Sequence, residues 1–201
     1  MLAGGVALLA VLLAAMGVGV RSASAQDCPT AQSAREGFVV ERGERSKTEV
    51  FHVDDSAVRT ILRYDGQSLL ETTQFQGLFQ LERLERGRRT VFQPKRDLAA
   101  FFPLKHGQNY SMGFDVKEAS GSTTIRTVTL SVKPGEDMYI GPCRYTVLKI
   151  ERSEALGEAA PRFIDFDHYS PELKLVLAKE YRERDGRTTL IKFDKIYPSK
   201  R

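Results

Sequence analysis

Apolar and polar residues alternate with a period of two along most of the chain after residue 25. Between 122 and 132 one face carries most of the apolar side chains, which are Val128, Leu130 and Val132. Near the C-terminal end Leu173, Leu175 and Leu177 share a face. This alternation predicts β-strands that are covered on one side. Because no window of 12 or more residues shows a clean helical period, we expect helical turns only at Thr30–Arg35, Lys95–Ala100 and Ser153–Ala159.

Turn residues separate these runs. Asp65-Gly66 lies between Val58–Tyr64 and Ser68–Phe75, and Asp185-Gly186 lies between Leu173–Arg184 and Thr188–Tyr197. Asp-Gly predicts a tight hairpin, since a type I′ turn needs positive φ at both central residues. Weaker hairpin signals and further breaks follow the same logic: Glu41-Arg42-Gly43, Gln76-Gly77, Arg86-Gly87, Ser120-Gly121 and Pro134-Gly135-Glu136-Asp137.

The regular spacing of turns predicts an all-β fold, mainly an antiparallel meander. With few short helices to cover it, the sheet must bury its apolar face by curving. We therefore expect a strongly curved sheet, a half-barrel or an open barrel, with a β-sandwich as the second choice. No linker or internal repeat interrupts residues 26–201, so they are expected to form a single domain.

Residues 1–25 have the composition of an export signal. Leu2–Val20 carry no charge, and Ala23-Ser24-Ala25 has the small-x-small form of a signal-peptidase site. Cleavage there removes one Arg and no acid, which lowers the formal charge from +4 to +3. We expect a cleaved signal peptide and a periplasmic or secreted domain without a transmembrane segment, with an uncleaved anchor as the alternative. The length and composition of residues 26–201 exclude a polytopic membrane protein, a disordered chain and a large multidomain enzyme.

The two cysteines, Cys28 and Cys143, both follow this segment. In an oxidising compartment they are expected to form one disulfide bond across the domain. Two unrelated thiols are the alternative. No CxxC motif is present to suggest redox chemistry or zinc binding, and the Gln26-Asp27 pair before Cys28 differs from the small apolar residues of a lipidation site.

No nucleophile elbow, zinc-protease or phosphate-loop motif occurs after residue 25. We therefore expect no cofactor and no metal. The densest polar stretch offers weak candidates for a general acid/base pair or a cation site, which are Asp165, Asp167, His168 and Glu172. The simpler interpretation is a strand that ends at Ser170-Pro171, with its acids facing solvent.

Six basic residues gather around the Arg86-Gly87 turn: Arg83, Arg86, Arg88, Arg89, Lys95 and Arg96. A cationic hairpin could contact anionic lipid headgroups or an envelope polymer. Glu82 and Glu85 interrupt the cluster, so a solvated hairpin is the alternative. A nucleic-acid partner is not expected at a net charge of +3.

Phenylalanines form a third feature: Phe75, Phe79, Phe92, Phe101 and Phe102. In a curved sheet they could line a groove for an acyl chain or an apolar peptide. The alternative is that they only fill the core.

Two runs carry a family resemblance, namely Phe102-Pro103-Leu104-Lys105-His106-Gly107-Gln108-Asn109-Tyr110 and Tyr169-Ser170-Pro171-Glu172-Leu173-Lys174-Leu175-Val176-Leu177. The chain resembles uncharacterised exported β-rich proteins of proteobacteria, which implies the compartment and the β class but no catalytic residues. Our leading hypothesis is a non-catalytic periplasmic or secreted domain that binds an envelope lipid, another apolar ligand or a partner protein. A hydrolase or metal-dependent enzyme centred on 165–172 is the alternative.

Overall fold

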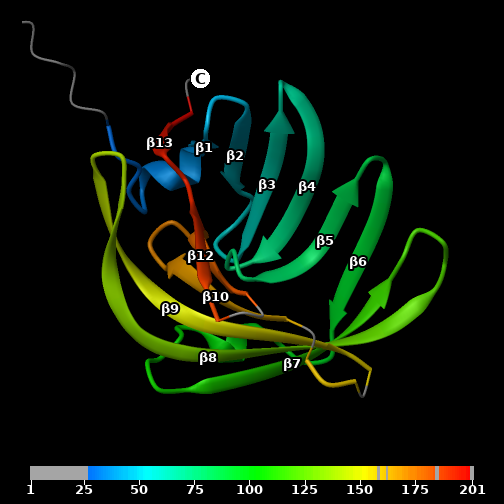
Figure 1. Ribbon diagram of the computed structural model, residues 1–201. Coiled ribbons are helices and arrows are strands. Elements are labelled where there is room, and N and C mark those ends of the chain that lie inside the picture. The colour runs from blue at the N-terminus through cyan, green and yellow to red at the C-terminus, as the bar shows by residue number, and fades with distance from the viewer. Residues whose placement is uncertain (1–26, 158, 162, 184–185, 200–201) are drawn as a thin grey trace, which may run out of the picture.

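The computed structural model describes residues 27–157, 159–161, 163–183 and 186–199 (Figure 1). In these ranges, thirteen strands form one antiparallel sheet in the order β12-β11-β10-β9-β8-β7-β6-β5-β4-β3-β2-β1-β13. The first six are β1 (Phe38–Arg42), β2 (Ser46–His52), β3 (Ala57–Tyr64), β4 (Gln67–Phe75), β5 (Phe79–Glu85) and β6 (Arg88–Pro94). The others are β7 (Asn109–Lys117), β8 (Thr123–Ile140), β9 (Cys143–Leu156), β10 (Phe163–Ser170), β11 (Leu175–Arg182), β12 (Thr188–Lys192) and β13 (Lys195–Pro198).

The prediction of an all-β antiparallel meander is confirmed. Helical structure among the described residues consists of two 3₁₀ turns, η1 (Ser33–Glu36) and η2 (Ala99–Phe101). The sheet is open, because no ladder joins β12 to β13 in the strand order. The sandwich alternative requires two sheets, whereas the described strands all belong to one.

The expected hairpins form where glycine permits positive φ. Asp65 and Gly66 have φ of 49° and 80°, and Arg86 and Gly87 have φ of 50° and 76°. Gln76 and Gly77 adopt the same conformation, with φ of 51° and 68°. Each pair has the left-handed backbone that a type I′ turn demands. The Asp185-Gly186 turn lies partly outside the described residues.

Three expectations about element boundaries are wrong. Pro134–Asp137 do not end a strand, because a β-bulge between Lys133 and Gly135 lets β8 continue past the proline. Ser153–Ala159 do not start a helical turn, since β9 stays extended to Leu156 and pairs with both β8 and β10.

The third correction concerns Thr188–Tyr197, which are two strands instead of one. The Phe193 amide donates to Leu177 O of β11, whereas the next amide, that of Asp194, donates to Glu41 O of β1. The chain therefore passes from one end of the strand order to the other within two residues. The sheet must bend to allow this, and Figure 1 shows β12 leading into β13, which lies beside β1.

Two apolar clusters form the core. One contains residues from both ends of the strand order, including Phe38 and Val50 near one end and Leu177 near the other. The other cluster gathers side chains from β5–β10 together with η2's neighbour Leu98, and within it the rings of Phe79 and Phe114 lie 6.2 Å apart. Distant strands thus share their buried faces.

The predicted disulfide between Cys28 and Cys143 is confirmed, with the two Cα atoms 5.5 Å apart. It joins the segment before η1 to the start of β9, where the Tyr145 hydroxyl also donates to Pro29 O over 3.0 Å. Since the Cys28 sulfur is bonded to Cys143, it is not free to carry a lipid thioether. No helix within the described ranges is long and apolar enough to cross a membrane.

Candidate functional site

The two runs that carry the family resemblance meet at one cleft. A hollow of about 300 Å³ lies where the segment after η2 approaches the end of β10. Its walls are Gln76, Phe102, Pro103, Leu104, Leu148, Tyr169 and Pro171. Most of these side chains are apolar, and the volume is at the lower end of the range for small-molecule sites. The cleft can therefore accept an apolar group of modest size.

Aromatic packing positions one wall of this cleft. The Phe102 ring lies 5.6 Å from the Phe75 ring and 6.2 Å from the Phe79 ring. Phe101 packs beside them, 5.9 Å from Phe79 and 5.3 Å from Tyr110. Because Phe79 is buried in the core, it gives Phe102 a rigid support.

Tyr169 positions the opposite wall. Its ring is buried, and its hydroxyl donates to Gln76 O over 2.8 Å. Burial raises the pKa of this phenol, so it remains a neutral hydrogen-bond donor at physiological pH. The bond joins the β4–β5 turn to the end of β10, so it fixes two walls of the cleft relative to each other.

The structure divides the five phenylalanines of the predicted groove between the core and the cleft. Phe79 and Phe92 are buried core residues, although one edge of Phe92 lines a different pocket, and Phe75 and Phe101 pack against the same core. Of the five candidates, Phe102 lines the cleft. Leu148 and Gln76 were missed, because no sequence pattern places β9 or the β4–β5 turn beside residues 102–104.

The polar stretch 165–172 is divided between two faces of β10. Asp167 is 1% exposed, and its carboxylate lies 2.5 Å from Lys179 Nζ and 3.6 Å from Arg152. Asp165 shares this face and lies 3.8 Å from Lys179 Nζ. Burial raises the pKa of Asp165. The expectation that these acids face solvent is therefore wrong for Asp167, which pairs with two cations instead.

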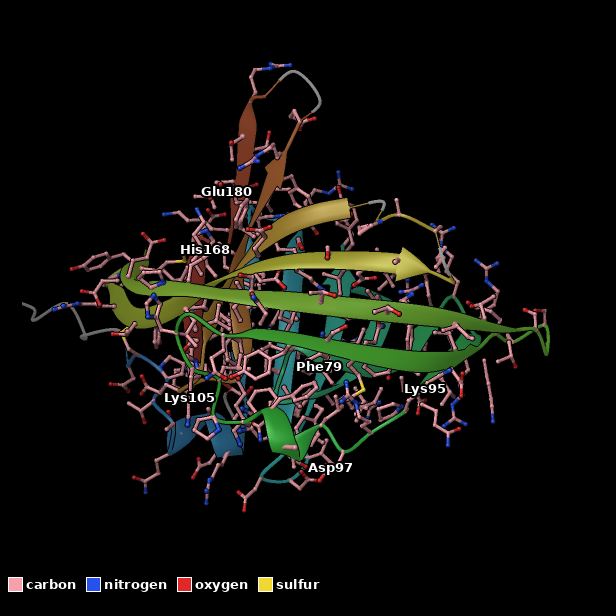
Figure 2. All side chains as sticks on the ribbon, turned by 90° about the horizontal axis from the view of Figure 1, so that it is seen from below. Phe79, Lys95, Asp97, Lys105, His168 and Glu180 are labelled. Atoms are coloured by element: carbon pink, nitrogen blue, oxygen red, sulfur yellow. A yellow bond between two sulfur atoms is a disulfide. The ribbon has the colours of Figure 1, made fainter. Side chains whose placement is uncertain are left out.

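His168 points to the other face. Its Nδ1 lies 3.0 Å from a Glu136 carboxylate oxygen and its Nε2 lies 3.6 Å from Glu180, although neither contact has hydrogen-bond geometry. Figure 2 shows His168 and Glu180 close together, far from Lys95. A hydrogen bond from Lys149 lowers the pKa of Glu180.

Glu172 is separated from both groups. Its carboxylate accepts a hydrogen bond from the Ala31 amide over 3.2 Å, which ties the segment after Cys28 to the β10–β11 turn. The four candidates therefore do not converge on one pocket. Within the described ranges, no group of three or more His, Cys, Asp or Glu side chains is arranged to hold a metal ion.

The six basic residues around the Arg86-Gly87 turn also lie in different surroundings. Arg83 and Arg88 line a pocket of about 310 Å³ that Phe92 and Arg126 complete. Arg89 faces away and forms two 2.8 Å hydrogen bonds with Glu82. The remaining candidates lie elsewhere: Arg86 in the turn, Lys95 beside Asp115, and Arg96 donating to Ser111 O.

Comparison with known proteins identifies no family for this chain. No family model matches it, and no curated protein matches. Among solved structures the chain is similar to the hypothetical lipoprotein YmcC from Escherichia coli (K12), at 10% sequence identity and a TM-score of 0.48. That similarity covers 81% of this chain and 87% of the other.

Proposed function

We propose that this protein is an exported, non-catalytic binding domain that takes an apolar ligand, such as the acyl chain of an envelope lipid, in the cleft beside Phe102. The observation that carries the proposal is the apolar wall of Phe102, Leu104 and Leu148 around an open hollow. These apolar side chains line an accessible hollow and do not fill it. Binding of an apolar ligand would displace water from them, which is favourable in free energy.

Two further observations support this function. A disulfide between Cys28 and Cys143 is typical of proteins that fold in an oxidising compartment such as the periplasm. The acidic candidates for catalysis are either neutralised by cations, as Asp167 is, or used in a structural contact, as Glu172 is. The geometry of 165–172 therefore favours binding over the hydrolase alternative.

Fluorescence quenching provides a direct test, because the chain contains no tryptophan. A Leu104→Trp variant places an indole at the cleft. Titration with a bromine-labelled fatty acid is expected to quench it in a saturable manner. Leu190→Trp is the matched control, since Leu190 is 51% exposed on β12 and does not line the cleft. Its emission is expected to stay unchanged at the same concentrations.

Equal quenching in both variants would show non-specific association and would contradict the proposal. So would the absence of saturation in L104W while its circular dichroism matches that of the unmodified protein. Mass spectrometry of an organic extract of the purified protein then identifies the acyl compound that copurifies with it.

A further inference from the structure

We infer that the inner face of the sheet carries a separate phosphate-binding site formed by Arg83, Arg88 and Arg126. The three arginines come from three different strands, β5, β6 and β8, and line one pocket of about 310 Å³. A carboxylate offers two oxygens, which one arginine can bind alone, whereas three arginines match the larger set of oxygens on a phosphate group.

The strand register places these arginines on one face. Arg83 of β5 is paired with Thr90 of β6, and Arg88 is paired with Glu85. Thr90 and Arg88 therefore share the face that also carries Phe92. Phe92 pairs with Val116 of β7, and Phe114 on the same face of β7 pairs with Arg126 of β8. A continuous row across four strands thus leads from Arg83 to Arg126.

The recorded contacts of the three arginines do not use all of their N–H donors. The Arg83 Nε is buried and has no hydrogen-bond partner among the residues that the structure describes, although a terminal nitrogen of Arg83 donates to Glu85 over 2.6 Å. A buried N–H that has no acceptor is costly, and an oxyanion would supply the missing acceptor. Arg88 is exposed and, among the described residues, forms no ion pair.

Arg126 is held in place from two sides. Its guanidinium lies 5.2 Å from the centre of the Phe92 ring, and one terminal nitrogen lies 3.3 Å from Glu154. The planar group is therefore positioned before a ligand arrives, which reduces the entropy lost on binding.

Two glutamates also line the pocket, and both already accept hydrogen bonds. Glu85 accepts from Arg83, and Glu118 accepts from the Thr90 hydroxyl over 2.9 Å. Three arginines therefore face two acids, which leaves a net positive lining. The Ser120 side chain is a further lining group that can donate to phosphate.

This site is independent of the proposed acyl cleft. The two hollows have no lining residue in common. The loss of one binding activity therefore does not imply the loss of the other.

Neighbouring arginines on opposite faces of β6 provide the experiment. Arg88→Gln and Arg89→Gln remove the same charge from adjacent positions, but Arg88 lines the pocket whereas Arg89 pairs with Glu82 on the other face. Inorganic phosphate is titrated into both folded variants and the unmodified protein, with binding followed by amide chemical shifts. R88Q is expected to weaken the affinity about 10-fold, because one charge-assisted hydrogen bond is lost, and R89Q is expected to change it less than twofold.

Sedimentation with phosphatidylglycerol vesicles and with phosphatidylcholine vesicles distinguishes the sources of the phosphate. Vesicle binding that R88Q loses and R89Q retains assigns the site to a lipid headgroup, and phosphate binding without vesicle binding assigns it to a soluble phosphate compound. The inference is overturned if phosphate does not bind in a saturable manner. An equal loss in R88Q and R89Q also overturns it, because that result indicates only diffuse attraction by surface charge.

Discussion

Charged side chains on the inner face of the sheet form cross-strand pairs. Arg152 contacts Asp167 on β10 and Glu154 on its own strand, and it donates to Leu78 O over 3.0 Å. Asp167 in turn contacts Lys179 of β11. These contacts explain how a buried carboxylate is accommodated: its desolvation is offset by the hydrogen bond from Lys179 and by the charge of the nearby Arg152.

We predict that Asp167→Ala lowers the free energy of unfolding by about 2–3 kcal/mol, because it leaves Arg152 and Lys179 without their buried partner. Urea denaturation followed by circular dichroism measures the change. Asp55→Ala is the control, since the Asp55 side chain is 91% exposed in its pair with Arg35, and its midpoint should match that of the unmodified protein. Similar losses for the two variants would contradict this account of Asp167.

Tyrosines give a prediction for alkaline pH. Burial, together with the Glu41 carboxylate, raises the pKa of Tyr197 to about 12, and burial also raises the pKa values of Tyr145 and Tyr169. Above pH of about 10 the unfolded chain releases phenolic protons that the folded chain retains. Stability is therefore complete below that pH and falls as the pH rises toward 12.

Urea midpoints between pH 9 and 11.5, compared with tyrosinate absorbance, measure this loss. Tyr197→Phe is expected to reduce the slope, because it removes one of the shifted groups. A midpoint that is independent of pH over this interval would contradict the prediction.

At the scale of secondary-structure elements, two similar turns have different surroundings. Gly77 packs against the β10–β11 turn so closely that a Cβ atom would lie 1.7 Å from Lys174 O. A Cβ on Gly87 would meet no atom within 4 Å. Both glycines have positive φ, so the contact alone distinguishes them.

We predict that Gly77→Ala costs about 3 kcal/mol or more, because backbone atoms must move apart. Gly87→Ala is expected to cost about 1 kcal/mol, the ordinary strain of a left-handed alanine. Thermal denaturation of the two variants measures the difference. Equal losses would show that the turn conformation, and not the packing against Lys174, determines the effect.

At the scale of the whole molecule, the disulfide closes a long loop. Cys28 and Cys143 are separated by 115 positions, and their bond links the segment before η1 to β9. A cross-link of this span restricts the unfolded chain strongly. It also keeps the N-terminal segment near the end of β9 that contributes Tyr145 to the core.

We predict that the double variant Cys28→Ser, Cys143→Ser loses about 4–5 kcal/mol of stability on the chain-entropy model. Urea denaturation of the oxidised protein and of the double variant measures this. Dithiothreitol should lower the midpoint of the former and leave that of the latter unchanged. A protein that is insensitive to reductant would contradict a stabilising role for the bond.

The strands and turns of this protein were easier to predict from its sequence than its candidate sites. Turn residues such as Asp65-Gly66 predicted the hairpins correctly, because a type I′ turn depends on two adjacent residues. The predicted strand end at Pro134 was wrong, because a β-bulge in the ladder with β9 lets β8 continue past the proline. The division of Thr188–Tyr197 into two strands at Phe193-Asp194 was missed. It depends on the carbonyl groups to which these two amides donate, and those belong to strands that are distant in sequence.

The order of residues was sufficient to predict an all-β antiparallel meander and the Cys28–Cys143 disulfide, because alternation, turn chemistry and a single cysteine pair leave few alternatives. The tertiary structure alone decided which side chains meet. It paired Asp167 with Lys179 and Arg152, placed Leu148 beside Phe102, and brought Arg126 to Arg83 and Arg88. These outcomes depend on strand register, bulges and sheet curvature, which arise from packing between segments that are distant along the chain.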